Sequence, residues 1–290
     1  MVAMPMERGG AQAATGDRSI RARVTILALV GFVAMASVAS LGTGAAGVSL
    51  TEVFGKWITG EALSVRERVV LFDIRLPHLL TGLLVGASLA VSGAVMQGLF
   101  RNPLADPGIV GVGAGAGLGS LAGASWAKLS AAAPIMVLAL VAAPLLARAL
   151  NGLALGEGAA AHLGVAVQRM KNLAILTVAA ATGAAVAVSG GIGFIGIVVP
   201  HLLRLVMGPD HRFLLPAAAL LGAGLLLLAD IISRLIIAPA ELPIGIVTAV
   251  LGGPIFLWIL LRRRGIVDMR GRDAGCTRDF RKPWAQPRTG

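Results

Sequence analysis

Residues 75–108 constrain the fold of this chain more than any other segment. They begin with an apolar run that is long enough to cross a bilayer, in which small residues such as Gly82, Gly86 and Gly93 recur. A polar loop with two prolines, residues 101–108, ends the run. Small residues let membrane helices pack with their backbones close together, because lipid provides no hydrophobic force between helices. The pattern therefore predicts a transmembrane helix that is packed inside a bundle.

Composition extends this prediction to most of the chain. Its 290 residues are 57% hydrophobic and only 13% charged, with a mean hydropathy of +0.86, which exceeds what a soluble domain can bury. The apolar runs are continuous rather than alternating, which excludes a transmembrane β-barrel. We therefore predict an all-α polytopic membrane protein with about eight transmembrane helices. The predicted spans are 24–46, 79–100, 108–123, 132–150, 173–189, 191–206, 216–237 and 244–261.

The net charge of +11 indicates membrane topology rather than nucleic-acid binding, because the basic residues lie between and outside the apolar runs. An even number of spans places both termini on one side. If that side is the cytoplasm, it holds 19 of the 25 Lys and Arg residues, as the positive-inside rule requires. We predict a cytoplasmic tail at residues 1–23, a transmembrane domain at 24–262 and a basic, disordered cytoplasmic tail at 263–290. The first apolar run lacks a cleavage motif and is expected to be a retained span.

The sequence contains no constellation typical of an enzyme or of a metal site. Its single cysteine, Cys276, lies in the polar tail, and neither HExxH nor the nucleotide-binding GxxxxGK[ST] motif occurs. The histidines are more simply explained as polar residues near span ends than as metal ligands. We therefore expect no catalysis, no metal and no bound cofactor in this chain. The four histidines are His78, His162, His201 and His211.

Four ordered motifs resemble the permease subunit of ABC importers for iron chelates, haem and cobalamin, the FecCD family. The first runs from Arg75 to Gly108 and includes MQGLFRNPLADPG, and the third includes GPDHRFLLPAAALLGA. These two stretches most resemble the sequences of haem permeases. The resemblance implies a bacterial inner-membrane protein that works as a homodimer in lipid. It also implies a separate ATPase subunit, which uses the ATP, and a periplasmic substrate-binding protein. The three later motifs are Leu150–Val165, Ser189–Ala223 and Ala229–Leu261.

The chain departs from the family in its number of spans. Family members have ten, and here GVGAGAGLGS is followed directly by LAGASWAKL, which resembles the approach to the sixth family span. We therefore expect the fourth and fifth family spans to be missing. The leading hypothesis is a permease for haem or another iron chelate, with ferric siderophore and cobalamin as further cargoes. The alternatives are a transport-incompetent remnant of such a permease and an ion-driven secondary transporter. The last would require acids or histidines at the midplane, and Asp230 alone is too little.

The resemblance assigns the connection between residues 151 and 164 to coupling with the ATPase, and places residues 200–212 beside it. From composition alone, the first segment fits an ordinary capped connector better, and Arg204 and Arg212 fit a plain positive-inside loop equally well. The predicted ATPase-coupling residues are Gly156, Glu157, Ala160, Leu163, Gly164, Arg204, Asp210, His211 and Arg212.

On the opposite side, the resemblance assigns Arg75, His78 and Arg234 to docking of the binding protein, since arginine binds carboxylates through two parallel hydrogen bonds. A helix-end arginine that faces lipid headgroups is the simpler alternative for Arg75. Asp230 is the one acid within an apolar run, and we expect it to pair with Arg234 on the same helix face. The translocation path is predicted to include Met96, Gln97, Gly252, Gly253 and Pro254, with Met96 as a packing residue rather than a haem ligand.

Overall fold

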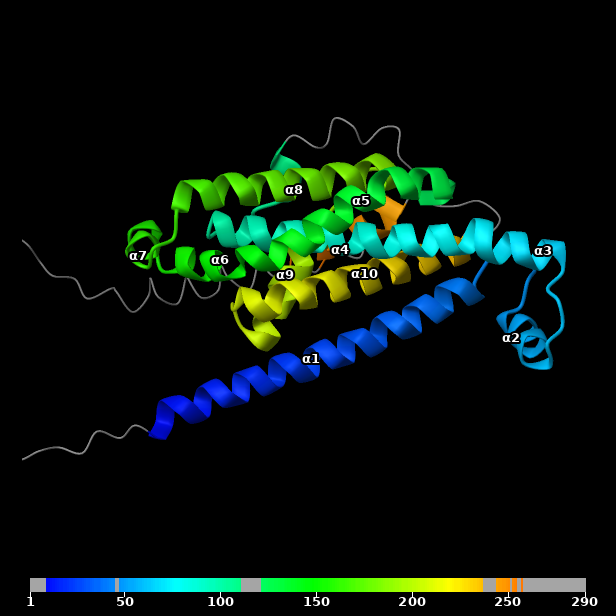
Figure 1. Cartoon of the computed structure of the whole chain (residues 1–290), viewed down its shortest axis with the longest axis horizontal. Coiled ribbons are helices and arrows are strands. Elements are labelled where there is room, and N and C mark those ends of the chain that lie inside the picture. Colours follow the sequence, from blue (N-terminus) through cyan, green and yellow to red (C-terminus); the bar gives the residue numbers. More distant parts are fainter. Residues whose placement is uncertain are drawn as a thin grey trace, which may run out of the picture.

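The structure is a computed structural model that describes residues 9–44, 47–110, 121–236, 244–250, 252–254 and 257. Within these residues the chain forms helices and turns and contains no strand. The long helices lie lengthwise beside one another in a single bundle (Figure 1). They are α1 (Gly9–Gly42), α4 (Leu76–Leu99), α5 (Trp126–Ala142), α8 (Val167–Ser189), α9 (Ile195–Met207) and α10 (His211–Ile236).

The predicted all-α membrane fold is confirmed. Seven of the eight predicted spans coincide with described helices, five of which are long and apolar enough to cross a membrane. The predicted span 108–123 lies mainly outside the described residues, and its described ends are the short 3-10 helices η2 (Pro107–Val110) and η4 (Leu121–Gly123). The five long stretches are Ser19–Gly42, Val65–Leu99, Trp126–Ala154, Val167–Ser189 and His211–Ile236, and the two shorter helices are Ile195–Met207 and Ile244–Pro254.

The helix that contains α4 is longer than a bilayer requires. α3 (Val65–Arg68) and the π-helix η1 (Val69–Arg75) continue into α4, which gives 35 helical residues and a length of about 52 Å. A bilayer core is about 30 Å thick, so one end of this helix projects beyond it. Ser64 and Glu67 form a capping box that starts the helix, and Lys56 of α2 (Leu50–Thr59) binds the Glu67 carboxylate at 2.7 and 2.9 Å. This ion pair fixes α2 beside the projecting end.

α4 lies at the centre of the bundle, in contact with α5, α8, α9 and α10. Its glycines permit two close backbone contacts. A Cβ atom on Gly86 would collide with the backbone of Gly222 in α10, and one on Gly93 would collide with the backbone of Gly196 in α9. The small residues therefore fix the neighbours of α4, as the sequence predicted.

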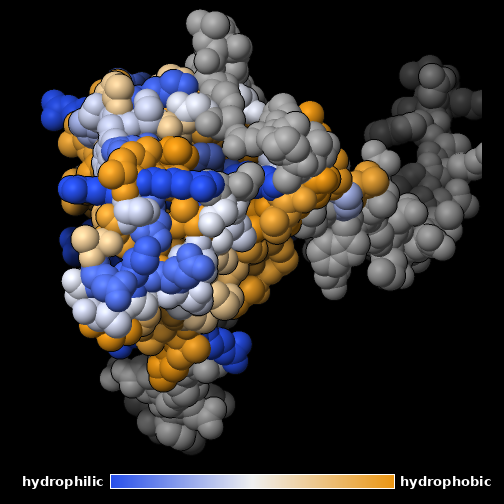
Figure 2. Space-filling view, turned by 90° about the vertical axis from the view of Figure 1, so that its right-hand side faces the viewer, coloured by the Kyte–Doolittle hydropathy of each residue, from blue (hydrophilic) through white to orange (hydrophobic). Residues whose placement is uncertain are grey.

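α1 lies on the outside of the bundle, mainly against α10, and only 11% of its apolar window is buried. The helix begins at Gly9, so the predicted tail at 1–23 is partly helical, and the apolar stretch begins at Ser19. The predicted tail at 263–290 lies outside the described residues. Figure 2 views the molecule from the end that carries α2 and α3: polar residues gather on this end and hydrophobic residues cover the adjoining flank.

We expect Gly93→Ala to destabilise the protein by about 1–3 kcal/mol, because the new methyl group would have to push α4 and α9 apart. The measurement is the thermal unfolding midpoint in detergent, followed by intrinsic fluorescence. Gly31→Ala in α1 is the matched control, since a Cβ atom there meets nothing within 4 Å. Equal midpoints for the two variants would contradict the packing role of Gly93.

Candidate functional site

The predicted coupling segment forms a short helix between two rods of the bundle. α5 continues through the 3-10 helix η5 (Ala143–Leu146) into α6 (Ala147–Ala154), and α7 (Glu157–His162) then leads to α8. Gly156 and Gly164 have φ angles of +111° and +79°, a conformation that disfavours residues with a Cβ atom. Ala160 is buried, whereas Leu163 is exposed. α7 is thus set off by two glycine turns and held to the bundle by one small side chain.

An ion pair connects α7 to α8. Lys171 donates to the Glu157 carboxylate at 2.6 Å, and this hydrogen bond lowers the pKa of Glu157 below its ordinary value. The Glu157 side chain is 58% exposed, so solvent screens the pair. Its role is to orient α7 rather than to stabilise the fold.

Asn151 links the coupling segment to the turn between α9 and α10. Its side-chain amide donates to the Asp210 carboxylate at 2.7 Å, and its carbonyl oxygen accepts from the His211 backbone at 3.0 Å and from the imidazole Nδ1 at 2.8 Å. The structure thus joins Asp210 and His211, two predicted coupling residues, to the base of the coupling segment. Sequence reasoning did not single out Asn151; the available signal was an amide in a short helix whose other residues, apart from Arg148, are small or apolar.

Arg204 lies on α9 and turns partly toward α4, where it donates to the Gln97 side-chain oxygen. Arg204, Asp210 and Asn151 also line a cleft of about 680 Å³ next to the α9–α10 turn. Arg212 is exposed, and its backbone N–H donates to Asp210 at 3.0 Å. All nine predicted coupling residues therefore lie at one end of the bundle, which also holds the start of α1 (Figure 1).

The predicted path residues on α4 do not face an open channel. Met96 and Gln97 are each only 2% exposed, and Gln97 donates to the carbonyls of Gly196 and Ile197 at 3.3 Å. Gln97 thus holds α4 against α9, and both side chains are buried within this single copy of the chain, so their assignment to a translocation path stays a prediction.

Three further path residues lie in the last described helix. Gly252 is buried against Phe194, Gly253 is half-buried and Pro254 is exposed. Gly252 thus allows the last described helix to pack closely against Phe194, the residue that precedes α9.

The predicted docking residues form a buried polar cluster at the other end of the bundle. Asp230 accepts from His78 Nε2 at 2.9 Å and from Arg234, as expected for the pair four residues apart. Arg234 also donates to the Ser40 hydroxyl at 2.9 Å, and Arg75 donates to the Leu41 carbonyl at 2.6 Å. The cluster therefore ties α1, α4 and α10 together.

Arg75 and His78 are buried in this conformation, and their roles in docking stay predictions. Arg75 is only 5% exposed, with its guanidinium against the carbonyls of Leu41 and Val48, and His78 is also buried. A carboxylate on another protein cannot reach either side chain in this conformation. Sequence reasoning missed this because an arginine at a helix end is equally compatible with a surface position and with capping of a neighbouring loop.

No group of three His, Cys, Asp or Glu side chains that could hold a metal ion occurs among the described residues. The polar clusters at both ends consist of hydrogen bonds and ion pairs within the chain. They can position helices and bind partners, and they have no arrangement of nucleophile and base.

Comparison with known proteins defines the family. The FecCD transport family matches residues 32–121 and 117–262. This chain belongs to the FecCD transport family. Among its family relatives, the hemin transport system permease protein HmuU of Yersinia pestis is 38% identical over 277 residues, covering 66% of this chain and 83% of the relative. The vitamin B12 import system permease protein BtuC of Salmonella typhi is 38% identical over 288 residues, covering 71% of this chain and 88% of the relative.

A solved structure of similar fold also comes from an ABC transporter. A protein named as a metal-chelate type ABC transporter, in an inward-facing conformation, has a TM-score of 0.72 and 28% sequence identity. That comparison covers 82% of this chain and 98% of the other.

The family comparisons also locate an internal gap. The family match comes in two pieces that meet at residues 117–121, where the fourth and fifth family spans were predicted to be missing. The match to the hemin permease extends over 277 residues yet takes up only 66% of this 290-residue chain. A long internal stretch of this FecCD relative therefore has no counterpart here.

We expect Asp230→Asn to cost about 3–5 kcal/mol, because it leaves the partly buried Arg234 without its counter-charge. Glu157→Gln is the matched control: it removes a carboxylate from an exposed pair and should leave the unfolding midpoint unchanged at neutral pH. Since the pKa of Glu157 is lowered, any contribution of its pair is present above the ordinary Glu value of 4.5 and is lost as the pH falls. Similar unfolding midpoints for both variants in detergent would contradict the role of Asp230 in holding α1, α4 and α10 together.

Proposed function

We propose that this chain is the membrane-spanning permease subunit of an ABC importer that moves haem or another iron chelate across the bacterial inner membrane. The observation that carries the proposal is the 38% identity to a hemin permease together with a family match on both sides of the gap. The cobalamin permease relative supports the same transport class and keeps the cargo open among large metal chelates. In this proposal a second copy of the chain, a separate ATPase and a periplasmic binding protein complete the importer.

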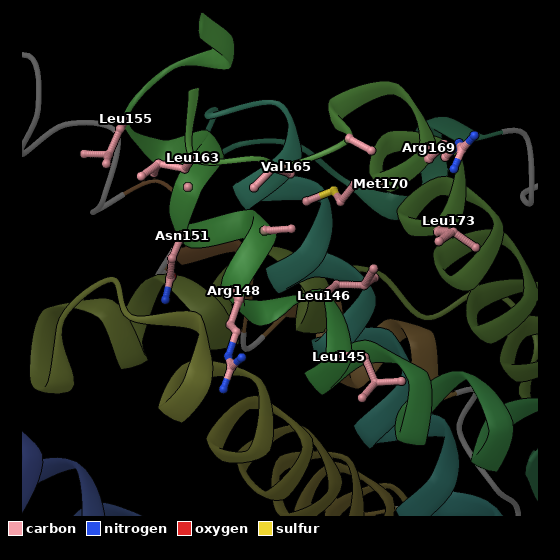
Figure 3. Close-up of a pocket in the computed structure, with 13 residues that line it drawn as sticks. Leu145, Leu146, Arg148, Asn151, Leu155, Leu163, Val165, Arg169, Met170 and Leu173 are labelled. Atoms are coloured by element: carbon pink, nitrogen blue, oxygen red, sulfur yellow. The ribbon is translucent and has the colours of Figure 1, made fainter. Parts of the chain in front are cut away.

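The α7 end of the bundle is proposed to face the cytoplasm, with both termini on that side. The predicted inner-side residues support this orientation. Arg148 and Arg169 line the groove next to α7 (Figure 3), and Arg212 lies in the first turn of α10, which starts at the same end. The opposite end holds Lys56, Arg68 and the polar cluster that contains Arg75 and Arg234. The excess of positive charge at the α7 end is what the positive-inside rule requires.

α7 is proposed to receive the movement of the ATPase. Its exposed residues are the small Gly158 and Ala161 and, at its two ends, the polar Glu157 and His162. Small residues at its centre suit a helix that enters a groove on a partner, and its two glycine turns leave it projecting from the bundle. Asn151 connects the base of this segment to Asp210 and His211 at the start of α10. Displacement of α7 would therefore move the start of α10, which packs against the central helix α4.

We expect Ala161→Arg to abolish stimulation of the cognate ATPase by the permease while yield and unfolding midpoint stay unchanged, because Ala161 is exposed on α7. A bulky charge at Gly156 is a poorer test, since the φ angle of +111° strains any residue with a Cβ atom. The measurement is ATP hydrolysis by the reconstituted complex. Gln168→Arg, an exposed position in the first turn of α8, is the control. Full stimulation by the Ala161 variant would refute the coupling role of α7.

The outer end is proposed to meet the binding protein through its surface rather than through Arg75 or His78. Those two side chains belong, with Arg234, to the polar cluster that ties α1, α4 and α10 together. Exposed groups at this end include Arg68 and the α2 side chains Phe54 and Trp57.

A transport-incompetent remnant is the second candidate function, and the internal gap favours it. A chain that lacks a long stretch of its relatives can keep the bundle and still lack part of the path. Met96 and Gln97, the predicted path residues of α4, are buried in this conformation.

Uptake into vesicles separates the two candidates. The chain is reconstituted with its ATPase and binding protein, and ATP-dependent accumulation of hemin, a ferric siderophore and cobalamin is measured. We expect hemin to accumulate at least tenfold above an ATP-free control. Association with both partners without uptake of any cargo would support the remnant and overturn the transport proposal.

A further inference from the structure

A groove of about 730 Å³ lies beside the coupling segment, between the α5–η5–α6 rod and the start of α8 (Figure 3). Apolar side chains form most of its lining, including Leu146, Val165 and Met170. The groove shares Asn151 and Leu163 with the coupling segment, and the proposed importer mechanism assigns it no ligand.

The groove extends from the end of the bundle into the level of the membrane. Leu145 and Leu173 line one part of it, and both belong to helical stretches that are apolar and long enough to span a bilayer. Leu145 is 80% exposed and Leu173 is also exposed, so this part faces hydrocarbon rather than water. The other part reaches Leu155 and Leu163, next to α7. A soluble partner cannot reach the membrane part, whereas a molecule with both a headgroup and acyl chains contacts both parts.

Charge at the rim selects the headgroup. Arg148 and Arg169 lie on opposite sides of the groove in Figure 3, and both are exposed. Neither side chain has a hydrogen bond or ion pair to another residue of the described chain, and none of the thirteen described lining residues is acidic. Asn151 lies on the Arg148 side of the groove, and its side chain binds Asp210 and His211. Two uncompensated cations at the membrane surface attract an anionic phosphate group.

We propose that this groove binds one acidic phospholipid of the cytoplasmic leaflet. Its phosphate lies at the polar rim that carries Arg148 and Arg169, and its acyl chains lie along Leu145 and Leu173. The choice of leaflet rests on the proposed orientation, whereas the site itself does not depend on transport. Because the lipid would contact Leu155 and Leu163 at both ends of α7, it would also brace the coupling segment.

Native mass spectrometry of the detergent-purified full chain tests the proposal, with 1-palmitoyl-2-oleoyl phosphatidylglycerol as the probe and the phosphatidylcholine of identical chains as the comparison. We expect one saturable phosphatidylglycerol per chain. An arginine near an anionic surface contributes about a factor of five to binding, so Arg148→Gln with Arg169→Gln should weaken it about 25-fold. Ala166→Phe, which fills the groove from an exposed lining position, should also reduce occupancy while the unfolding midpoint stays unchanged.

The matched control is Arg23→Gln with Arg101→Gln, which removes the same charge from exposed positions outside the groove. This double variant should retain the lipid. Equal retention of phosphatidylglycerol by all variants, or equal binding of phosphatidylcholine by the unaltered chain, would overturn the proposal. Displacement of the lipid by millimolar inorganic phosphate would overturn it in favour of a free-anion site, and displacement by the ATPase would overturn it in favour of a protein contact. None of these readouts requires uptake, so failure of the transport proposal is measured separately.

Discussion

Contact between the backbones of α4, α9 and α10 is the interaction on which the rest of this bundle depends. Lipid gives no hydrophobic gain for helix association, so the helices must be held by close packing and by hydrogen bonds. Gly86 against Gly222 and Gly93 against Gly196 allow that approach. The approach then brings Gln97 within 3.3 Å of two α9 carbonyls and within reach of Arg204. A polar side chain deep in the bundle is thereby satisfied only because glycines precede it at the right spacing.

The two polar clusters determine how the helices pair at each end of the bundle. Buried charges are costly without partners, so each cluster specifies which helix ends can meet. Asp230 with Arg234 and His78 fixes α10 against α4 and α1 at one end. Asn151 fixes α6 against the start of α10 at the other. α10 is therefore anchored at both ends, and one anchor adjoins the proposed coupling segment. This is a continuous set of contacts from α7 to the opposite end of the bundle, and mutation at either anchor tests whether it carries movement.

Sequence reasoning identified the helices well and the partners of individual side chains poorly. Spans were predictable because apolar length is a local property, and the pairing of Asp230 with Arg234 was predictable because both lie on one helix. The burial of Arg75 was not, since its acceptors Leu41 and Val48 are distant in sequence and are backbone carbonyls that carry no residue-type signal. Met96 and Gln97 were placed on a path for their polarity, but the same polarity serves contact with α9. Asn151 was overlooked because its role depends on a turn sixty residues away.

The internal gap shows which part of the FecCD architecture the fold requires. The second part of the family match begins at residue 117, before the first part ends at residue 121, and the predicted loss of two adjacent spans would preserve the direction of every later helix. The apolar window of α4 is nevertheless 83% buried, and its contacts come from α5, α8, α9 and α10 on the far side of the gap. The central helix thus obtains its packing from helices that this chain retains. Stability and transport can therefore separate here: the retained helices supply the contacts that hold the bundle together, whereas the proposed path through a dimer would also depend on surfaces that packing alone does not maintain.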